Sequence, residues 1–268
     1  MGCEAQGGKT LVAGAHSGYL LGRHRNGSSD TTDNTPMTAD PSLFVNAEGS
    51  IIASLSQEQK QAAMATAVDR RVKRGEVLLA HGDPGSTMIL LRKGVCKVCR
   101  YTAGGKEIIL DYVGPGQVVG EISLFDDAPR TASVIAVDPC DVTVFQRRDV
   151  LELVSRDADL ALRIIKLLCS RLRKTNALLE GDRSYAMGPK LARGLVRLID
   201  DHGLSVEQAP HLRFPISQGD LGNFVGLSRE NVNRQLREWH DDGVLELRSG
   251  RIVVLDVDAL QDIAGFAD

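Results

Sequence analysis

The chain has no long run of apolar residues and no excess of positive charge. No stretch of its 268 residues approaches the roughly 20 apolar residues that a membrane span needs, and the start lacks the apolar core of a secretory leader. We therefore expect a cytoplasmic protein with no membrane partner. An apolar content of 43% and a charged content of 25% are typical of a soluble globular protein with room for two domains.

The balance of charge gives no support to nucleic-acid binding. The formal net charge is −3, and residues 188–268 hold nine Lys and Arg against thirteen Asp and Glu. A positively charged domain is the usual electrostatic sign of a DNA-binding protein. Any affinity for DNA must therefore come from a locally basic face.

Cysteine is scarce and unevenly placed. The five cysteines are odd in number and scattered, which fits a reducing compartment. Cys96 and Cys99 have the spacing of half a zinc or iron–sulfur site, but they lie in a strand-like run, where residues three apart point to opposite faces. No second pair follows at a suitable spacing. We expect no metal site, and no nucleophile–base arrangement indicates an enzyme.

The composition changes along the chain in a way that indicates a tail followed by a β-rich domain. Residues 1–40 are rich in Gly, Ser, Thr, Asn and Asp and are expected to be disordered. Ser56 and Gln59 form a capping box for a helix to about Val68. Six short β-rich runs then alternate with turns, at 76–80, 87–91, 95–101, 107–112, 131–137 and 141–146. Runs of this kind predict a β-barrel or sandwich domain over 41–150.

A helix of about 30 residues is predicted over 148–180. Its seam repeats at intervals of four and three residues, at Ala161, Ile165, Leu168, Leu172, Thr175 and Leu179. This spacing favours a parallel coiled-coil homodimer through a dimerisation helix over 151–183. A single helix packed against its own barrel is the alternative. Gly188-Pro189 then starts a new helix over 190–201 and places the domain boundary near 182–188.

Residues 217–242 have the pattern of a helix-turn-helix. Ser217 is expected to cap the first helix, Gly226 to permit the turn, and Ser228 to cap the second helix. The apolar residues that should face inward are Leu221, Phe224 and Val225 in the first helix and Val232, Leu236 and Trp239 in the second. The outward-facing residues are Arg229, Glu230, Asn233, Arg234 and Arg237.

A β-hairpin is expected after the second helix. Two β-rich runs flank Ser249-Gly250 within residues 244–256, so residues 188–268 read as a winged helix. The start of the second helix enters the major groove in such folds. There Arg229 or Arg234 could bind guanine, and the carboxylate of Glu230 could accept from cytosine N4. We therefore predict binding to double-stranded DNA, with a protein partner as the alternative.

Residues 118–136 suit an anionic ligand that carries a sugar. Gly120 lets backbone N–H groups approach closely, and a helical turn starting at Glu121 presents its positive end. Arg130 can form paired hydrogen bonds to a phosphate, with the hydroxyl of Thr131 beside it, and Glu121 can accept from sugar hydroxyls. The alternative is a surface loop in which Glu121 and Arg130 only pair with each other.

The segment GEISLF (120–125) followed by PRTA (129–132) resembles the phosphate-binding cassette of cyclic-nucleotide-binding domains. The order of barrel, long helix and winged helix, with SRENVNR (228–234), is similar to the CRP/FNR family of bacterial regulators, which includes the cyclic AMP receptor proteins, over about residues 45–265. This resemblance implies an α+β fold. Its parts would be an N-terminal β-barrel or jelly-roll cyclic-nucleotide-binding domain, a dimerisation helix and a C-terminal winged helix-turn-helix.

The resemblance also implies a ligand site. Its residues would be Gly120, Glu121, Ile122, Ser123, Arg130, Thr131, Thr175 and Asn176. Glu121 would take the ribose 2′-hydroxyl and Arg130 the cyclic phosphate, while Thr175 and Asn176 would meet the base. Cyclic AMP is the first choice as allosteric ligand. Cyclic GMP is the second, because a threonine at position 131 resembles cassettes in which it helps to hold guanine. The alternative also includes a regulator of this family that responds to another small ligand or to none. No catalytic cofactor is implied.

The resemblance further implies the macromolecular partners. The DNA-binding residues would be Ser217, Ser228, Arg229, Glu230, Asn233 and Arg234. Arg229, Glu230 and Arg234 match the base-reading residues of the family, which implies a palindromic operator with half-sites like TGTGA. The chain would act as a homodimer, with RNA polymerase as a further partner.

Overall fold

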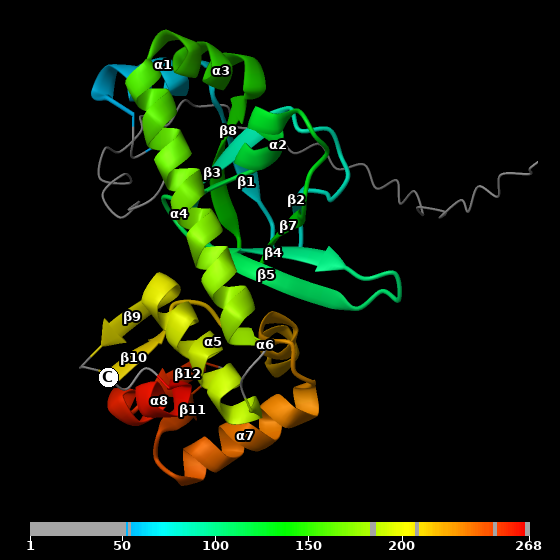
Figure 1. Cartoon of the computed structure of the whole chain (residues 1–268), viewed down its shortest axis with the longest axis vertical. Helices are drawn as coiled ribbons and strands as arrows, with labels where there is room; N and C mark the ends of the chain where they lie inside the picture. Colours follow the sequence, from blue (N-terminus) through cyan, green and yellow to red (C-terminus); the bar gives the residue numbers. More distant parts are fainter. Residues whose placement is uncertain (1–51, 53–54, 183–185, 207–208, 249–250, 266–268) are drawn as a thin grey trace, which may run out of the picture. The chain divides into compact units, whose positions relative to one another are not determined.

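The computed structural model describes residue 52 and residues 55–182, 186–206, 209–248 and 251–265. The tail expected over 1–40 lies outside these residues, as do the hairpin residues Ser249 and Gly250. Figure 1 shows the two β-sheets of the N-terminal part with helices α1 (Gln57–Thr66) and α3 (Arg147–Arg156) at one end. Helix α4 (Ala158–Asp182) runs from that end towards the C-terminal part.

The first helix, α1 (Gln57–Thr66), begins at the expected capping box. The backbone N–H of Ser56 donates to Gln59 Oε1 over 2.8 Å, and the N–H of Gln59 donates to Ser56 Oγ over 3.2 Å. The helix ends two residues before the expected Val68, because a strand that was not predicted, β1 (Val68–Val72), starts there. This edge strand has four exposed residues, so it lacks the alternation that reveals a strand.

The strands form a jelly-roll of two antiparallel sheets, as predicted. The remaining strands are β2 (Val77–Leu79), β3 (Thr87–Lys93), β4 (Cys96–Tyr101), β5 (Glu107–Val113), β6 (Val118–Val119), β7 (Ser133–Ala136) and β8 (Cys140–Gln146). One sheet has the order β1-β8-β3-β6 and the other β2-β7-β4-β5. Buried side chains from both sheets, among them Ile89, Val134 and Val142, pack together between them.

The helix predicted over 148–180 is two helices. They are α3 (Arg147–Arg156) and α4 (Ala158–Asp182), so the predicted single helix is wrong at Asp157. The backbone of Asp157 is extended, and its side chain accepts from the N–H of Leu160 over 3.0 Å. An aspartate that caps a new helix in this way competes with continuing the previous one.

Helix α4 has one buried and one exposed apolar side. Leu160 and Ile164 are buried against the barrel, where Val150 also packs. Ile165 and Leu172 on the predicted seam are 53% and 61% exposed. The packing of the helix on its own barrel, which the sequence left as the alternative, is therefore present, and part of the predicted seam is exposed.

The C-terminal part is a winged helix. Its elements are α5 (Met187–His202), β9 (Gly203–Val206), β10 (Ala209–Leu212), α6 (Gln218–Val225), α7 (Arg229–Asp241), β11 (Leu245–Arg248), β12 (Arg251–Val254) and α8 (Val257–Ala264). Helix α5 begins three residues before the predicted start at 190. Pro189 falls within its first turn, where a backbone N–H has no partner to lose.

The predicted hairpin over 244–256 is confirmed. Strands β11 and β12 pair in antiparallel register, with Arg248 opposite Arg251. They belong to a sheet of order β11-β12-β10-β9, whose second hairpin, β9–β10, was not predicted.

The two cysteines of the CxxC spacing point to opposite faces, as expected. Cys96 faces the barrel interior, with its Sγ 3.7 Å from Cys140 Sγ, whereas Cys99 packs in the core shared with the winged helix. Among the described residues, no group of three or more His, Cys, Asp or Glu could hold a metal ion. No helix within the residues that the structure describes is long and apolar enough to cross a membrane.

Candidate functional site

Gly120 allows a close approach of backbone and side chain at the start of α2 (Glu121–Asp126). Its φ of +87° lies in the left-handed region, which favours glycine. A Cβ atom at this position would lie 2.6 Å from Arg130 Nη1 and 3.0 Å from the Thr87 carbonyl oxygen. The short helix therefore starts where only glycine fits, and the predicted helical turn at Glu121 is confirmed.

Arg130 is buried beside this glycine, with 4% of its surface exposed. Its Nη1 donates to the Gly120 carbonyl over 2.7 Å, and its Nη2 donates to the Thr87 carbonyl over 2.6 Å and to Thr87 Oγ1 over 3.0 Å. Burial lowers the pKa of Arg130, while the charges of Glu121 and Asp83 oppose this shift. The result is a guanidinium with a fixed orientation at the start of α2.

Glu121 is also buried, at 6% exposure, but it does not pair with Arg130. Its carboxylate forms an ion pair with Arg171, which lies on α4. The alternative reading, a loop in which Glu121 and Arg130 only pair with each other, is therefore wrong. The cassette is joined instead to the long helix that precedes the winged helix.

Arg171 is a site residue that sequence reasoning missed. Thr175 Oγ1 donates to the Arg171 carbonyl over 3.0 Å, since residues four apart lie on the same side of a helix. Thr175 and Asn176 are both exposed on α4, one turn after Arg171. The signal that could have identified Arg171 was its position four residues before the predicted Thr175.

The remaining cassette residues fall into two groups. Thr131 and Ile122 are exposed, the latter at 46%. Ser123 is buried, and its hydroxyl donates to the Pro129 carbonyl over 3.3 Å. The side chain of Ser123 therefore stabilises the loop that leads to Arg130.

The helix-turn-helix has the predicted caps and core. Ser217 Oγ accepts from the N–H of Asp220 over 2.9 Å, and Ser228 Oγ accepts from the N–H of Asn231 over 3.2 Å. Gly226 ends α6 with a φ of +72°. The expected inward residues of α7 are buried, at 0% exposure for Val232, 1% for Leu236 and 3% for Trp239.

The residues expected to read DNA lie mainly on the outer face of α7. Arg229, Glu230 and Arg234 are exposed. Asn233 is half-buried, and its Nδ2 donates to Gln218 Oε1 over 2.9 Å, so it joins the two helices. The pKa of Glu230 is lowered by its own backbone N–H and by the Ser228 hydroxyl. Its charged form can accept a hydrogen bond from a base.

Two family models match the two halves of the molecule. A cyclic nucleotide-binding domain matches residues 69–157, and a Crp-like helix-turn-helix domain matches residues 189–263. The cyclic AMP receptor protein of Thermus thermophilus is 30% identical over 78% of this chain and 94% of its own length. The chain belongs to the CRP/FNR family of transcription regulators.

Two further comparisons agree with this result, one in sequence and one in fold. A CRP-like cAMP-activated global transcriptional regulator of Mycobacterium tuberculosis is 26% identical over 81% of this chain and 94% of its own length. The structure of FixK2 from Bradyrhizobium japonicum superimposes with a TM-score of 0.67 at 19% identity, covering 76% of this chain and all of that one. The chain thus has the fold and the domains of a cyclic-nucleotide-binding, DNA-binding transcription regulator.

Proposed function

We propose that the chain is a homodimeric regulator that binds cyclic AMP in its barrel and a palindromic operator through α7. The observation that carries this proposal is the ion pair between Glu121 and Arg171. It connects the cassette, where Arg130 is held for a phosphate, to the helix that leads into the winged helix. A ligand that engages Glu121 would therefore act on α4 directly.

The chemistry of the cassette suits a cyclic nucleotide. The buried guanidinium of Arg130 and the backbone N–H groups at the start of α2 would hold the cyclic phosphate. Glu121 would accept from the ribose 2′-hydroxyl, and Thr175 with Asn176 would meet the base. Two relatives are described as a cyclic AMP receptor protein and as cAMP-activated, which favours cyclic AMP. The exposed Thr131 makes cyclic GMP the second candidate.

The exposed seam of α4 supports dimerisation. Ile165 and Leu172 would be covered by the same residues of a second copy, as in a coiled coil. A nucleotide that contacts α4 would then extend the seam and rotate the winged helices about residues 182–188. The two α7 helices would lie one helical turn apart, ~34 Å, on a palindrome with TGTGA-like half-sites. Such a ligand shifts the equilibrium only through its different affinities for the two states.

Calorimetric titration with cyclic AMP and cyclic GMP tests the ligand site. We expect saturable binding that Arg130→Ala and Glu121→Ala abolish, whereas Arg71→Ala, at an exposed arginine on β1, leaves it unchanged. Wild-type affinity in the Arg130 variant would refute the site. If the dissociation constant is lower for cyclic GMP, cyclic GMP becomes the first candidate ligand and the rest of the proposal stands.

Gel shifts on a palindromic duplex with and without nucleotide test the regulated DNA binding. Arg234→Ala should cost ~1–3 kcal/mol on the specific operator, and an equal loss on random DNA would exclude base reading by this residue. We also expect RNA polymerase to bind the chain on the operator. If the chain never retains the duplex but binds a protein through its winged helix, the proposed binding to an operator is refuted.

A further inference from the structure

The β4–β5 hairpin of the barrel packs against the winged helix through a shared apolar core. Cys99, Ile109 and Tyr112 from the hairpin belong to the same cluster of buried residues as the core of the winged helix. The ring centroid of Tyr112 lies 4.9 Å from that of Phe214 and 5.7 Å from that of Phe224 on α6. Apolar packing holds the two surfaces together but does not by itself set one orientation.

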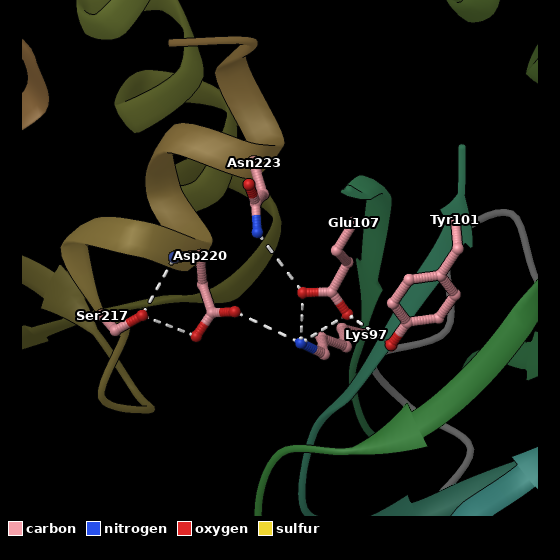
Figure 2. Close-up of polar contacts among 6 residues, drawn as sticks. All are labelled: Lys97, Tyr101, Glu107, Ser217, Asp220 and Asn223. Carbon is pink, nitrogen blue, oxygen red and sulfur yellow. Dashed lines mark hydrogen bonds and ion pairs between the residues drawn. The ribbon is translucent and has the colours of Figure 1, made fainter. Parts of the chain in front are cut away.

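A cluster of polar side chains at the edge of this core joins the hairpin to α6 (Figure 2). We call it the Lys97 cluster, and its members are Lys97, Tyr101 and Glu107 of the hairpin with Asp220 and Asn223 of α6. Lys97 Nζ lies 2.8 Å from the Glu107 carboxylate and 3.2 Å from Asp220 Oδ1. Asn223 Nδ2 donates to Glu107 Oε2 over 3.4 Å, and the Tyr101 hydroxyl donates to Glu107 Oε1 over 3.1 Å.

The central ion pair of this cluster is well shielded from solvent. The side chains of Lys97 and Glu107 are 17% and 14% exposed, and that of Asp220 is 36% exposed. Burial lowers the pKa of Lys97, but the hydrogen bond to Glu107 and the charge of Asp220 outweigh it, so the pKa is raised overall. Lys97 therefore stays charged between two carboxylates, one on the hairpin and one on α6.

The orientation of α6 determines that of α7. Asn233 of α7 donates to Gln218 of α6. A Cβ atom at Gly222 of α6 would lie 2.7 Å from the Leu227 carbonyl oxygen in the turn between the helices. The two helices are thus in close contact. The cluster uses α6 and leaves Arg229 and Arg234 of α7 exposed, so it is compatible with DNA reading.

The same hairpin is bonded to the strand that follows the nucleotide cassette. Strand β4 pairs with β7, with Cys99 opposite Ser133, and Ser133 comes three residues after Arg130. One hairpin therefore touches both the cassette strand and the first helix of the helix-turn-helix.

We propose that Lys97 is a positioning residue for DNA reading, which acts by holding Asp220 of α6 on the barrel. This rests on the proposed function, since it presumes that α7 reads an operator. The ion pair with Asp220 keeps the reading helix of each chain at a set angle to its barrel. The reading helices of a dimer can then match two half-sites at once.

A double-mutant cycle on operator affinity tests the proposal, with Lys97→Met, Asp220→Asn and their combination measured by fluorescence anisotropy at saturating cyclic AMP. We expect Lys97→Met to weaken binding on the order of tenfold, as for loss of a hydrogen bond to a charged group. Asp220→Asn should have a smaller effect. The double variant should match Lys97→Met within about twofold, the usual error of additivity. Lys97→Arg should keep most of the affinity.

Lys106→Met is the matched control, because it removes the same charge at an exposed residue in the turn of the same hairpin. It should bind the operator like the wild type, and all variants should keep the calorimetric affinity for cyclic AMP. Wild-type operator affinity in Lys97→Met, or independent losses that multiply in the double variant, would overturn the proposal. Independent losses would mean that Asp220 acts on DNA directly.

Hydrogen exchange separates this proposal from the proposed function. If the wild type binds no operator, the proposed function has failed, but exchange still reports on the cluster. Lys97→Met should then speed exchange of the amides in β5 and α6 more than Lys106→Met does, and equal rates in the two variants would refute the contact.

Discussion

The guanidinium of Arg171 on α4 forms an ion pair with the carboxylate of Glu121 at the start of α2. Glu121 is buried at 6% exposure, and the guanidinium supplies an opposite charge beside its carboxylate. The pair joins two elements that are 50 residues apart in the sequence. It gives the nucleotide cassette a direct contact with the helix that leads to the winged helix.

Replacing Arg171 by Met should lower the free energy of unfolding, because it leaves the buried carboxylate of Glu121 unpaired. We expect the combination with Glu121→Gln to be less destabilising than the sum of the two single changes. The coupling should be about 1 kcal/mol, since Arg171 is partly exposed and solvent screens the pair. Urea unfolding of the four proteins measures it, and strictly additive losses would show that the pair contributes nothing.

Gly120→Ala should destabilise the chain and displace Arg130. The added methyl group meets Arg130 Nη1 at 2.6 Å, in a backbone conformation that disfavours side chains. Gly105→Ala has a similar positive φ of +78° but open space around it, so it measures the backbone cost alone, roughly 1 kcal/mol. Thermal unfolding should show a larger loss at position 120, together with weakened cyclic AMP binding. Equal losses at the two positions would contradict the close approach.

The stability of the chain should depend on the protonation of His202, which is buried at 3% exposure. Its Nε2–H donates to the Tyr112 carbonyl over 3.1 Å. Burial lowers the pKa of His202, and the charges of Asp111 and Asp201 oppose this only in part. Below the unfolded pKa of about 6.5, the unfolded chain binds a proton that the folded chain does not. Its contribution to stability is therefore complete above this pH and falls as the pH drops towards the folded value.

Urea unfolding between pH 5 and 8 measures this effect. The slope due to His202 is at most about 1.4 kcal/mol per pH unit. His202→Gln keeps a donor for the Tyr112 carbonyl but cannot titrate, so its profile should be flatter below pH 6.5. His81→Gln, at an exposed histidine, is the matched control for replacing one imidazole. Parallel profiles for the wild type and the position 202 variant would exclude the role of His202.

Charged residues on the seam of α4 should prevent dimerisation without unfolding the chain. Ile165 and Leu172 are more than half exposed, so Glu at both positions costs little within one chain but cannot be buried between two. Sedimentation should show monomers, and operator binding should weaken. Lys166→Glu, a charge reversal beside the seam, should remain dimeric. A double variant that sediments like the wild type would place the dimer contact elsewhere.

Most of the architecture could be predicted from local signals. The capping box at Ser56, the turns of the barrel, the Ser217 and Ser228 caps and the inward set Val232, Leu236 and Trp239 all depend on residues close in sequence. The elements that were missed lacked such signals. Strand β1 is polar along most of its length, and the break at Asp157 depends on a cap within a helical pattern.

The residues of the candidate site could be predicted from the sequence, but their contacts could not. Gly120, Glu121 and Arg130 were identified from their chemistry and spacing, and they lie together. Their partners could not be predicted, because they lie far away in the sequence. Arg130 donates to the carbonyls of Gly120 and Thr87, 10 and 43 residues away, and Glu121 pairs with Arg171, 50 residues away. Nothing in the segment 118–136 indicates that Glu121 pairs with the long helix rather than with Arg130.

The sequence by itself determined most of the strands, helices and caps, because hydrophobic period, turn chemistry and capping act within a few residues. Only the tertiary structure decided that Glu121 pairs with Arg171 and that Lys97 lies between Glu107 and Asp220. A charged side chain takes its partner from whichever element packing brings within reach, and that choice depends on the whole fold.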